Sequence, residues 1–474
     1  MAQSFDPARA SLTELTAALR SRVLSAEDLM QSTLRALDAT HERLHAIVSR
    51  RPSDVLLAEA RAAQARLARG DARPLEGIPM GVKDLEDAAG LPTTYGSRLF
   101  SASAPASHDS TQVARLKGAG AIVVGKTNTP EFGYTVITKN LVHGVTSSPW
   151  NADFTPGGSS GGSAAALAGG VLPLVTASDG GGSIRVPAAF CGAFGLKPSH
   201  GRVPLGPSEL WDSTAMAVYG PLTKTVADAA LLLDLTSGPD PHDAQSLPPP
   251  AVRFVDRLQE PLGRKLRIAY SRDFGYVPVE PDVADCVEGA VATFRELGHE
   301  IVDCRGGPPD LGTFWGLAFA RYLDEWIGET IAPRPQDVTR TLVQWIAAAR
   351  GAAPAFWAEQ ARARMNVVRW FAAVFAEHDV LLTPTVPCDP PPAKGPVPAS
   401  VGDSPLPGAG LAAFTMPANL AWLPAATVRA GLSRAGFPVG LQIIAPRGAD
   451  DLVLRVAHAF ERHRPWHPNW PIAR

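Results

Sequence analysis

Residues 157–185 read GGSSGGSAAALAGGVLPLVTASDGGGSIR, and this glycine- and serine-rich stretch is the most unusual part of the chain. Glycine loses much backbone entropy on folding, so its density here indicates a local need for close backbone approach. Gly180, Gly181 and Gly182 directly precede Ser183. Successive N–H groups of such a run can turn toward one point and bind an oxyanion. Ser183 therefore stands where the nucleophile of a hydrolase is expected.

A serine nucleophile needs a base, and the segment contains no histidine. A histidine-driven triad would have to recruit its base from elsewhere in the chain. Lys83 is the rival candidate, because the apolar stretch 77–84 is predicted to form a short strand that ends in two charged residues. The reference pKa of lysine is about 10.4, so Lys83 can act as a base near neutral pH only if burial suppresses its charge.

Outward from this stretch, the N-terminal part of the chain has helical periodicity. Ser11 and Ser25 are each followed three residues later by an acidic residue, a pattern that starts amphipathic helices. A third helical pattern covers residues 53–69. We therefore expect residues 1–70 to form an N-terminal helical segment that packs on the core.

Helix and strand patterns alternate in the rest of the chain. A helix, a glycine and a strand follow one another at 111–124 and again at 283–302. Such alternation is typical of a largely parallel or mixed sheet covered by helices. The predicted fold class is therefore α/β, with a central mixed β-sheet covered on both faces by α-helices.

Composition excludes several classes of partner. The chain has 474 residues, with 44 Lys and Arg against 46 Asp and Glu, and no block of like charge that would attract nucleic acid or an anionic membrane. Its four cysteines include no CxxC pair, which argues against disulfides or a thiolate metal site. No signal peptide or membrane span is expected, and a cytoplasmic location is predicted.

Three ordered motifs lie at 77–84, 157–162 and 179–187. Five further matching segments lie at 191–192, 195–198, 220–223, 419–420 and 438–442. Together these motifs resemble the amidase signature family of serine hydrolases, and the resemblance covers most of residues 10–462. It implies an amidase signature fold and an acyl-enzyme intermediate.

The resemblance also implies roles for single residues. Lys83 would be the base, Ser159 the bridging serine that follows a cis peptide bond, and Ser183 the nucleophile of a Ser-cisSer-Lys triad. The oxyanion-hole donors would be the backbone N–H groups of Gly180, Gly181, Gly182 and Ser183. The supporting residues would be Asp179 and Arg185, which brace the loop, and Ser160, which is a hydrogen-bonding neighbour.

The expected domain organisation follows the motifs. The N-terminal segment precedes an amidase signature α/β domain at 71–462, with a catalytic core at about 77–235, variable substrate loops at about 305–410 and a C-terminal tail at 463–474. Five tryptophans fall within 315–370. Core packing is the preferred interpretation of this stretch, and a substrate wall is the alternative. Trp150 and Trp422 are candidate substrate-binding residues.

The predicted function is an amidase for carboxylic amides, apolar or aryl ones above all, with esters and carbamates as further candidates. The alternative is the glutamine-hydrolysing subunit of a tRNA-dependent amidotransferase. In those relatives, an acidic residue that recognises glutamine lies three positions before the residue that corresponds to Thr415. This chain has Ala412 there, which argues against glutamine.

A zinc protease is a remote alternative, because residues 41–45 read HERLH and satisfy the HExxH pattern. The pattern falls where a predicted helix gives way to an apolar strand, which argues against two zinc ligands on one helical face. No metal and no cofactor are therefore expected. The expected partner is a small-molecule amide substrate, with no nucleic acid and no membrane, and homodimerisation stays open.

Overall fold

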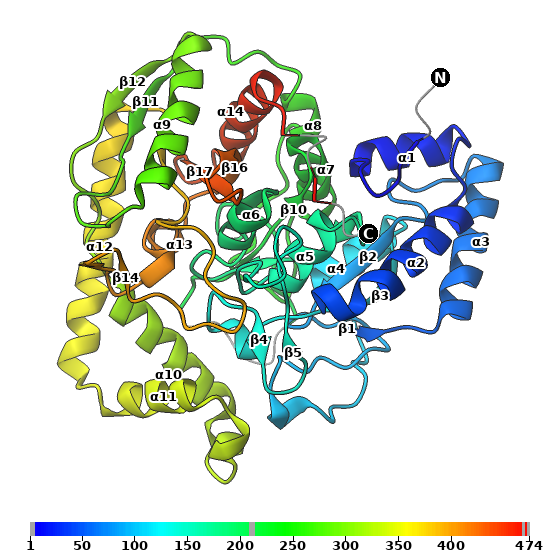
Figure 1. Cartoon of the computed structure of the whole chain (residues 1–474), viewed down its shortest axis with the longest axis horizontal. Coiled ribbons are helices and arrows are strands. Elements are labelled where there is room, and N and C mark those ends of the chain that lie inside the picture. Colours follow the sequence, from blue (N-terminus) through cyan, green and yellow to red (C-terminus); the bar gives the residue numbers. More distant parts are fainter. Residues whose placement is uncertain (1–4, 208–213, 467–469, 472–474) are drawn as a thin grey trace.

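Helices lie on most sides of the molecule, and several of the strands lie between them (Figure 1). The computed structural model describes residues 5–207, 214–466 and 470–471. The α-helices are α1 (Leu12–Arg20), α2 (Ala26–Leu44), α3 (Ser53–Arg69), α4 (Thr111–Gly118), α5 (Gly161–Ala168), α6 (Arg185–Cys191), α7 (Val226–Thr236), α8 (Phe254–Arg257), α9 (Pro281–Glu296), α10 (Gly312–Ile331), α11 (Arg340–Gly351), α12 (Pro354–Glu377), α13 (Met416–Leu420) and α14 (Asp450–His463). In Figure 1, α10, α11 and α12 lie on the side of the molecule opposite to α1, α2 and α3.

The larger sheet is mixed. Its strands, in spatial order, are β10 (Leu222–Thr223), β8 (Phe194–Lys197), β16 (Ala425–Leu432), β17 (Pro438–Ile444), β13 (Val380–Pro384), β11 (Arg267–Tyr270) and β12 (Glu300–Asp303). The pairs β13–β11 and β11–β12 are parallel, and the other pairs are antiparallel.

Helices cover both faces of this sheet. Gln442 of β17 faces α6 and accepts a hydrogen bond from Arg185 at 2.7 Å. Val439 lies on the opposite face, since side chains alternate along a strand. Its cross-strand partner Gly431 lies against Cys286 of α9. The predicted mixed sheet with helices on both faces is therefore confirmed.

A smaller sheet carries the strand that ends in Lys83. Its spatial order is β1 (Ile47–Arg50), β3 (Ile122–Thr127), β2 (Pro79–Lys83) and β6 (Leu174–Val175). Strand β2 is parallel to both neighbours, and β1 is antiparallel to β3. The edge strand β6 contacts β10 of the larger sheet. Three two-stranded sheets pair β4 (Lys139–Asn140) with β5 (Gly144–Val145), β7 (Ser178–Asp179) with β9 (Val218–Tyr219), and β14 (Ser400–Val401) with β15 (Ser404–Pro405).

The predicted helix starts are present. At α1, the Ser11 amide donates to the Glu14 carboxylate at 2.7 Å and the Glu14 amide donates to the Ser11 hydroxyl at 3.2 Å. At α2, the hydroxyl of Ser25 accepts from the amide of Asp28 at 2.9 Å. These caps satisfy amides that a helix leaves without internal partners.

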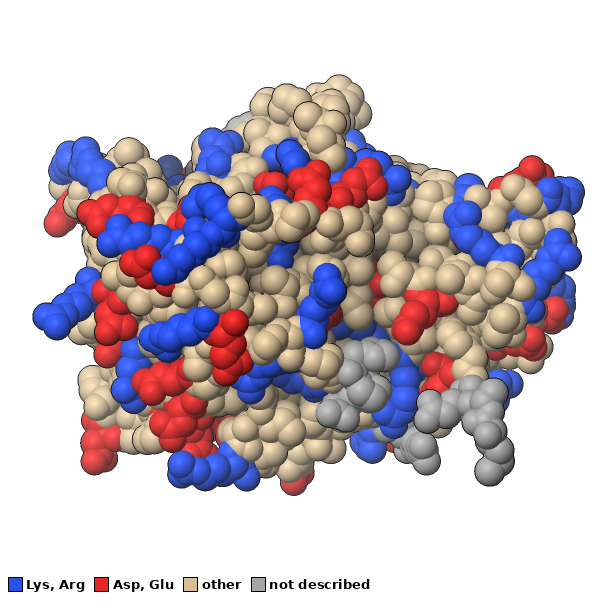
Figure 2. Space-filling model, turned by 90° about the horizontal axis from the view of Figure 1, so that it is seen from above, with Lys and Arg blue, Asp and Glu red and all other residues tan. Residues whose placement is uncertain are grey.

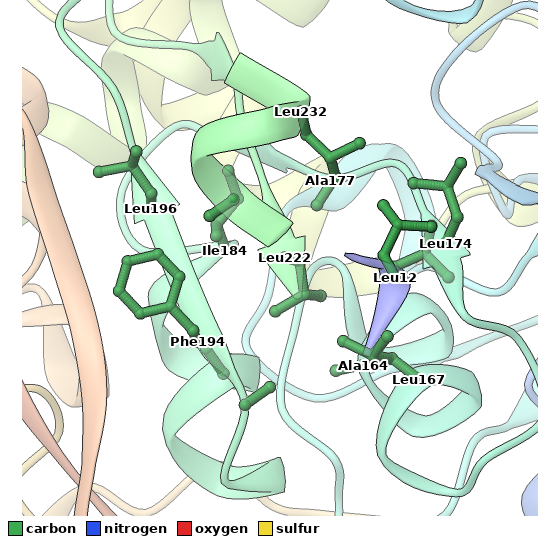
Figure 3. Close-up of a cluster of buried hydrophobic side chains, with 14 of the residues drawn as sticks. Leu12, Ala164, Leu167, Leu174, Ala177, Ile184, Phe194, Leu196, Leu222 and Leu232 are labelled. Atoms are coloured by element: carbon green, nitrogen blue, oxygen red, sulfur yellow. The ribbon is translucent and has the colours of Figure 1, made fainter. Parts of the chain in front are cut away.

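One apolar cluster joins the N-terminal helices to both sheets (Figure 3). Leu12 of α1, Ala164 of α5, Leu174 of β6 and Phe194 of β8 all belong to it and are almost completely buried. The N-terminal segment therefore shares its core with the rest of the chain. None of the described helices is both long and apolar enough to cross a membrane.

Candidate active site

The amine of Lys83 lies in a buried cage of serine oxygens. The side chain is completely buried at the end of β2. Its Nζ donates to the hydroxyls of Ser159 at 2.9 Å, Ser160 at 2.8 Å and Ser178 at 2.9 Å, and it lies 3.3 Å from the Ser178 carbonyl. Among the described residues, no carboxylate forms an ion pair with this amine.

Ser178 was not singled out from the sequence. It lies at the start of β7, five residues before Ser183, inside the same glycine-rich segment. Its hydroxyl reaches Lys83 because β7 follows the buried strand β6, which is the parallel neighbour of β2. The only sequence signal was its place in the segment, and serine there is equally compatible with an exposed loop.

Burial changes the protonation of Lys83. Removal from water favours the neutral amine and lowers its pKa to about 7, although the charges of Glu86 and Asp179 oppose this shift. Glu86 is buried as well, and burial raises the pKa of its carboxyl. The condition set for a lysine base near neutral pH is therefore met.

The segment that carries Ser159 and Ser160 is held tightly. The peptide bond between Gly158 and Ser159 is cis, and α5 begins directly after Ser160. Gly133, in the short 3-10 helix Glu131–Gly133, lies against Ser159: a Cβ atom on this glycine would approach the Ser159 hydroxyl to 3.1 Å, and its backbone is left-handed, with φ of 74°. A side chain at position 133 would press on the Ser159 hydroxyl.

Ser183 follows β7 and is only partly buried. Its carbonyl accepts a hydrogen bond from the Ser160 amide at 3.2 Å, which brings the loop beside the Lys83 cage. Within the described residues, the Ser183 hydroxyl has no hydrogen-bond partner and can rotate. Catalytic contacts are often loose before a substrate binds.

An ion pair inside the loop braces it. Arg185 Nη2 and Asp179 Oδ1 are 2.9 Å apart, and both side chains are fully buried. Burial alone would raise the pKa of Asp179, but the Arg185 guanidinium and its hydrogen bonds bring that pKa below its usual range. Arg185 also donates to Asn419 at 2.6 Å and to Gln442 at 2.7 Å, so both C-terminal motifs hold the same guanidinium.

The three loop glycines are not equivalent. The amide of Gly182 donates to Asp179 Oδ1 at 2.7 Å, so this N–H is already used inside the protein. The predicted oxyanion role of Gly182 is therefore not supported. Within the described residues, the amides of Gly180, Gly181 and Ser183 have no hydrogen-bond partner.

The indole N–H groups of the two candidate substrate-binding tryptophans both donate to backbone carbonyls. The indole of Trp150 donates to the carbonyl of Cys191 at 2.9 Å, at the C-terminal end of α6. The indole of Trp422 donates to the carbonyl of Ala215 at 2.6 Å, and its ring stacks on His200 with the centroids 4.8 Å apart. A substrate-binding role of either residue stays a prediction.

The tryptophans of 315–370 divide into two kinds. Trp326 packs in an aromatic cluster, with its ring centroid 5.1 Å from that of Tyr95, which fits the core-packing interpretation. Trp315 differs, because its indole donates to the carbonyl of Gly180 at 2.9 Å. One member of the stretch thus contacts the nucleophile loop.

The HERLH segment does not have the geometry of a zinc helix. Helix α2 ends at Leu44, and His45 has a left-handed backbone with φ of 49°. His41 and His45 therefore do not lie one turn apart on a continuous helix. In the described ranges, no three His, Cys, Asp or Glu side chains gather where they could hold a metal ion.

Comparison with known proteins places the chain in a family. A family model described as Amidase matches residues 28–454. A glutamyl-tRNA(Gln) amidotransferase subunit from Chloroflexus aggregans (strain MD-66 / DSM 9485) is 35% identical over 96% of this chain and 96% of its own length. An acylamidase of Rhodococcus erythropolis is 34% identical over 97% of each chain. The crystal structure of a bacterial aryl acylamidase of the amidase signature family has a TM-score of 0.89 at 30% identity, over 97% of each chain.

The chain therefore belongs to the amidase signature family, whose hydrolases act on carbon–nitrogen bonds. This result confirms the resemblance seen in the sequence and the predicted α/β amidase signature fold. The relatives include both an acylamidase and an amidotransferase subunit, with almost equal identities. Overall similarity does not separate the two functions.

Proposed function

We propose that this protein is an amidase that hydrolyses carboxylic amides through an acyl-enzyme on Ser183, with Lys83 as the base and Ser159 as the bridge. The observation that supports it best is the cage around Lys83: a fully buried amine, 2.9 Å from the Ser159 hydroxyl, whose pKa burial lowers to about 7. A neutral amine beside a hydroxyl can accept its proton.

The proposed reaction moves a proton from Ser183 through Ser159 to Lys83. Neutral Lys83 takes the proton of Ser159 while Ser159 takes that of Ser183, whose oxygen attacks the amide carbonyl. The carbon–nitrogen bond then breaks, and the relay returns one proton to the leaving amine. Water then attacks the resulting ester and gives a proton to the same relay. The relay passes this proton to the Ser183 oxygen as its bond to the acyl carbon breaks, which frees the acid and restores Ser183. Ser160 and Ser178 keep the amine aimed at the bridge through their own hydrogen bonds.

The negative charge that forms on the carbonyl oxygen needs donors. We assign this role to the amides of Gly180, Gly181 and Ser183, which have no hydrogen-bond partner in the part of the chain that the structure describes. Gly182 is left out, because its amide donates to Asp179. Backbone donors that are in place before the reaction need no reorganisation as charge develops. Asp179 and Arg185 support the loop that carries these donors.

An apolar substrate is favoured by the residue at position 412. Thr415 donates to the Gly181 carbonyl at 2.6 Å, and its amide donates to the carbonyl of Ala412 at 3.0 Å, so position 412 lies beside the nucleophile loop. Its side chain is a methyl group, whereas the family resemblance implies a carboxylate there in glutamine-hydrolysing members. Aryl and other apolar amides are the proposed substrates, and esters and carbamates are further candidates.

The second candidate function is the glutamine-hydrolysing subunit of a tRNA-dependent amidotransferase, which the 35% identity to an amidotransferase subunit favours. The test compares kcat/KM for an anilide with that for glutamine. Apolar burial contributes roughly 25 cal/mol per Å², so an aryl group that buries about 100 Å² favours the anilide by about two powers of ten. A ratio in favour of glutamine would make the amidotransferase the first candidate.

The nucleophile is tested separately. Ser183→Ala is expected to lower kcat by about a factor of 10⁴ or more without lowering Tm. A fluorophosphonate should add one label, on the peptide that contains Ser183. Ser163→Ala is the matched control, because the Ser163 hydroxyl donates to the carbonyl of Thr176 and not to the Lys83 cage. Turnover of Ser183→Ala within tenfold of the wild type would disprove the assignment.

The proposed partner is a small-molecule amide, and no cofactor takes part in the proposed steps. On the face that Figure 2 shows, basic and acidic side chains are interspersed, so this face offers no continuous basic surface to a polyanion. Homodimerisation and a cytoplasmic location stay predictions.

A further inference from the structure

Helix α10 reaches the nucleophile loop from outside the three sequence motifs. Its fourth residue is Trp315, and the indole N–H donates to the carbonyl of Gly180 at 2.9 Å. The ring also lies against the next residue: a Cβ atom on Gly181 would be only 2.4 Å from the Trp315 ring. Trp315 therefore contacts two successive residues of the loop, by a hydrogen bond and by packing.

These contacts determine where an amide points. The peptide bond between Gly180 and Gly181 is trans, so its C=O and N–H point in opposite directions. Because Trp315 holds the oxygen on one side, the N–H of Gly181 is directed to the other side. Thr415 holds the next carbonyl, that of Gly181, at 2.6 Å. Two consecutive peptide planes of a glycine run are thus fixed by side chains from distant parts of the chain.

A later part of α10 packs near the segment that contains Gly133. The ring centroid of Trp326 lies 5.1 Å from that of Tyr95 and 6.2 Å from that of Phe132. Phe132 directly precedes Gly133, which lies against Ser159. Helix α10 therefore contacts the nucleophile loop through Trp315 in its first turn. It contacts the segment beside the bridging serine through Trp326.

We propose that Trp315 is a positioning residue for the oxyanion hole, which orients the N–H of Gly181 toward the reacting carbonyl oxygen. The proposal rests on the proposed amidase function. A run of three glycines samples many backbone conformations, so without the indole the Gly181 amide would have to be ordered during the reaction. Fixed donors act on the transition state more than on the bound substrate. The loss should therefore appear in kcat and not in KM.

The test compares Trp315→Phe with Trp370→Phe. Trp315→Phe removes the N–H and keeps an aromatic ring near Gly181. Trp370 is the matched control, because Trp315 and Trp370 are both partly buried and pack against the same cluster of buried apolar residues. The ring centroid of Trp370 lies 5.0 Å from that of Phe371. The readouts are Tm, and kcat and KM for an anilide. Two inhibition constants are added: the Ki of a trifluoromethyl ketone, which mimics the tetrahedral intermediate, and the Ki of an uncharged aniline as the product analogue, which does not.

For Trp315→Phe, we expect kcat to fall by about 10- to 100-fold, somewhat less than the loss of a whole oxyanion donor, with KM changed less than about threefold. The trifluoromethyl ketone should lose affinity in parallel with kcat, whereas the product analogue should not. Trp370→Phe should leave kcat, KM and both Ki values within about twofold. This pattern would support the proposal.

Two results would overturn it. One is a kcat of Trp315→Phe within twofold of the wild type. The other is a fall in kcat that Trp370→Phe shows as well, or one that is accompanied by an equal loss of affinity for the product analogue. Either pattern would indicate a general loosening of the fold and not a specific effect on the oxyanion hole. Failure of the amidase proposal itself looks different, because wild-type protein would then release no amine from any anilide.

Discussion

Two buried lysines on neighbouring parallel strands have opposite surroundings. Lys83 ends β2, and Lys126 lies on β3 one residue out of register with it. The Lys83 amine has serine hydroxyls as neighbours. The Lys126 amine lies 3.5 Å from the carboxylate of Asp84 and donates to the hydroxyl of Thr93 at 2.8 Å.

Burial is common to both lysines, so any difference in their chemistry must come from the neighbouring groups. Burial lowers the pKa of both lysines, but at Lys126 the nearby Asp84 carboxylate is the main charge that opposes the shift. A nearby carboxylate favours the charged form of a buried amine, whereas the serine hydroxyls around Lys83 carry no charge that would do so. We therefore propose that Lys83 takes part in the chemistry and that Lys126 supports the structure.

Of the variants that distinguish Lys83 from Lys126, Lys83→Met is expected to have the largest effect on kcat. Removal of a general base lowers kcat by about 10²–10⁴-fold, and the protein should stay folded because a neutral side chain of similar size replaces a desolvated amine. Anilide turnover and Tm are measured on the same preparation. Activity close to that of the wild type would show that Lys83 is not the base.

Lys126→Met should act on stability instead. It leaves the buried Asp84 carboxylate without its cation, which costs about 3–5 kcal/mol of folding free energy. Urea unfolding measures this loss. The protein that remains folded should show the same rise of activity with pH as the wild type. A shift in the pH at which activity is half-maximal would mean that Lys126 influences the protonation of Lys83.

The pH profile tests the protonation state of Lys83 directly. Burial lowers the pKa of Lys83 to about 7, and only the neutral amine accepts a proton, so kcat/KM should rise through about pH 7 and then level off. Below that pH, kcat/KM should fall about tenfold per unit as the amine gains a proton. A rate that declines as pH rises from 6 to 8 would contradict a neutral lysine base.

The smallest effect is expected from Ser178→Ala. It removes one hydroxyl that lies 2.9 Å from Lys83 Nζ. A hydrogen bond of about 1 kcal/mol corresponds to about a fivefold loss of kcat. Because this oxygen accepts from the amine and so favours its charged form, the rise in kcat/KM should move to lower pH. Ser163→Ala should leave that midpoint unchanged, and a shift there would point to a general effect of the segment.

Local structure and family were readable from the sequence. The capping pair Ser11 and Glu14 and the helical pattern 53–69 appear in the structure as predicted, because both depend on residues within one helical turn of each other. The ordered motifs around Lys83 and Ser183 identified the amidase signature family. The assignment of Lys83 and Ser183 as base and nucleophile stays a proposal.

Only the tertiary structure decided which groups surround each candidate. The Ser178 hydroxyl reaches Lys83 across 95 positions, and the Trp315 indole reaches Gly180 across 135. Periodicity and motifs report which residues are present and how local segments fold. Hydrogen bonds and desolvation depend on distances between segments that are remote in the chain, and these exist only once the sheets and helices have packed.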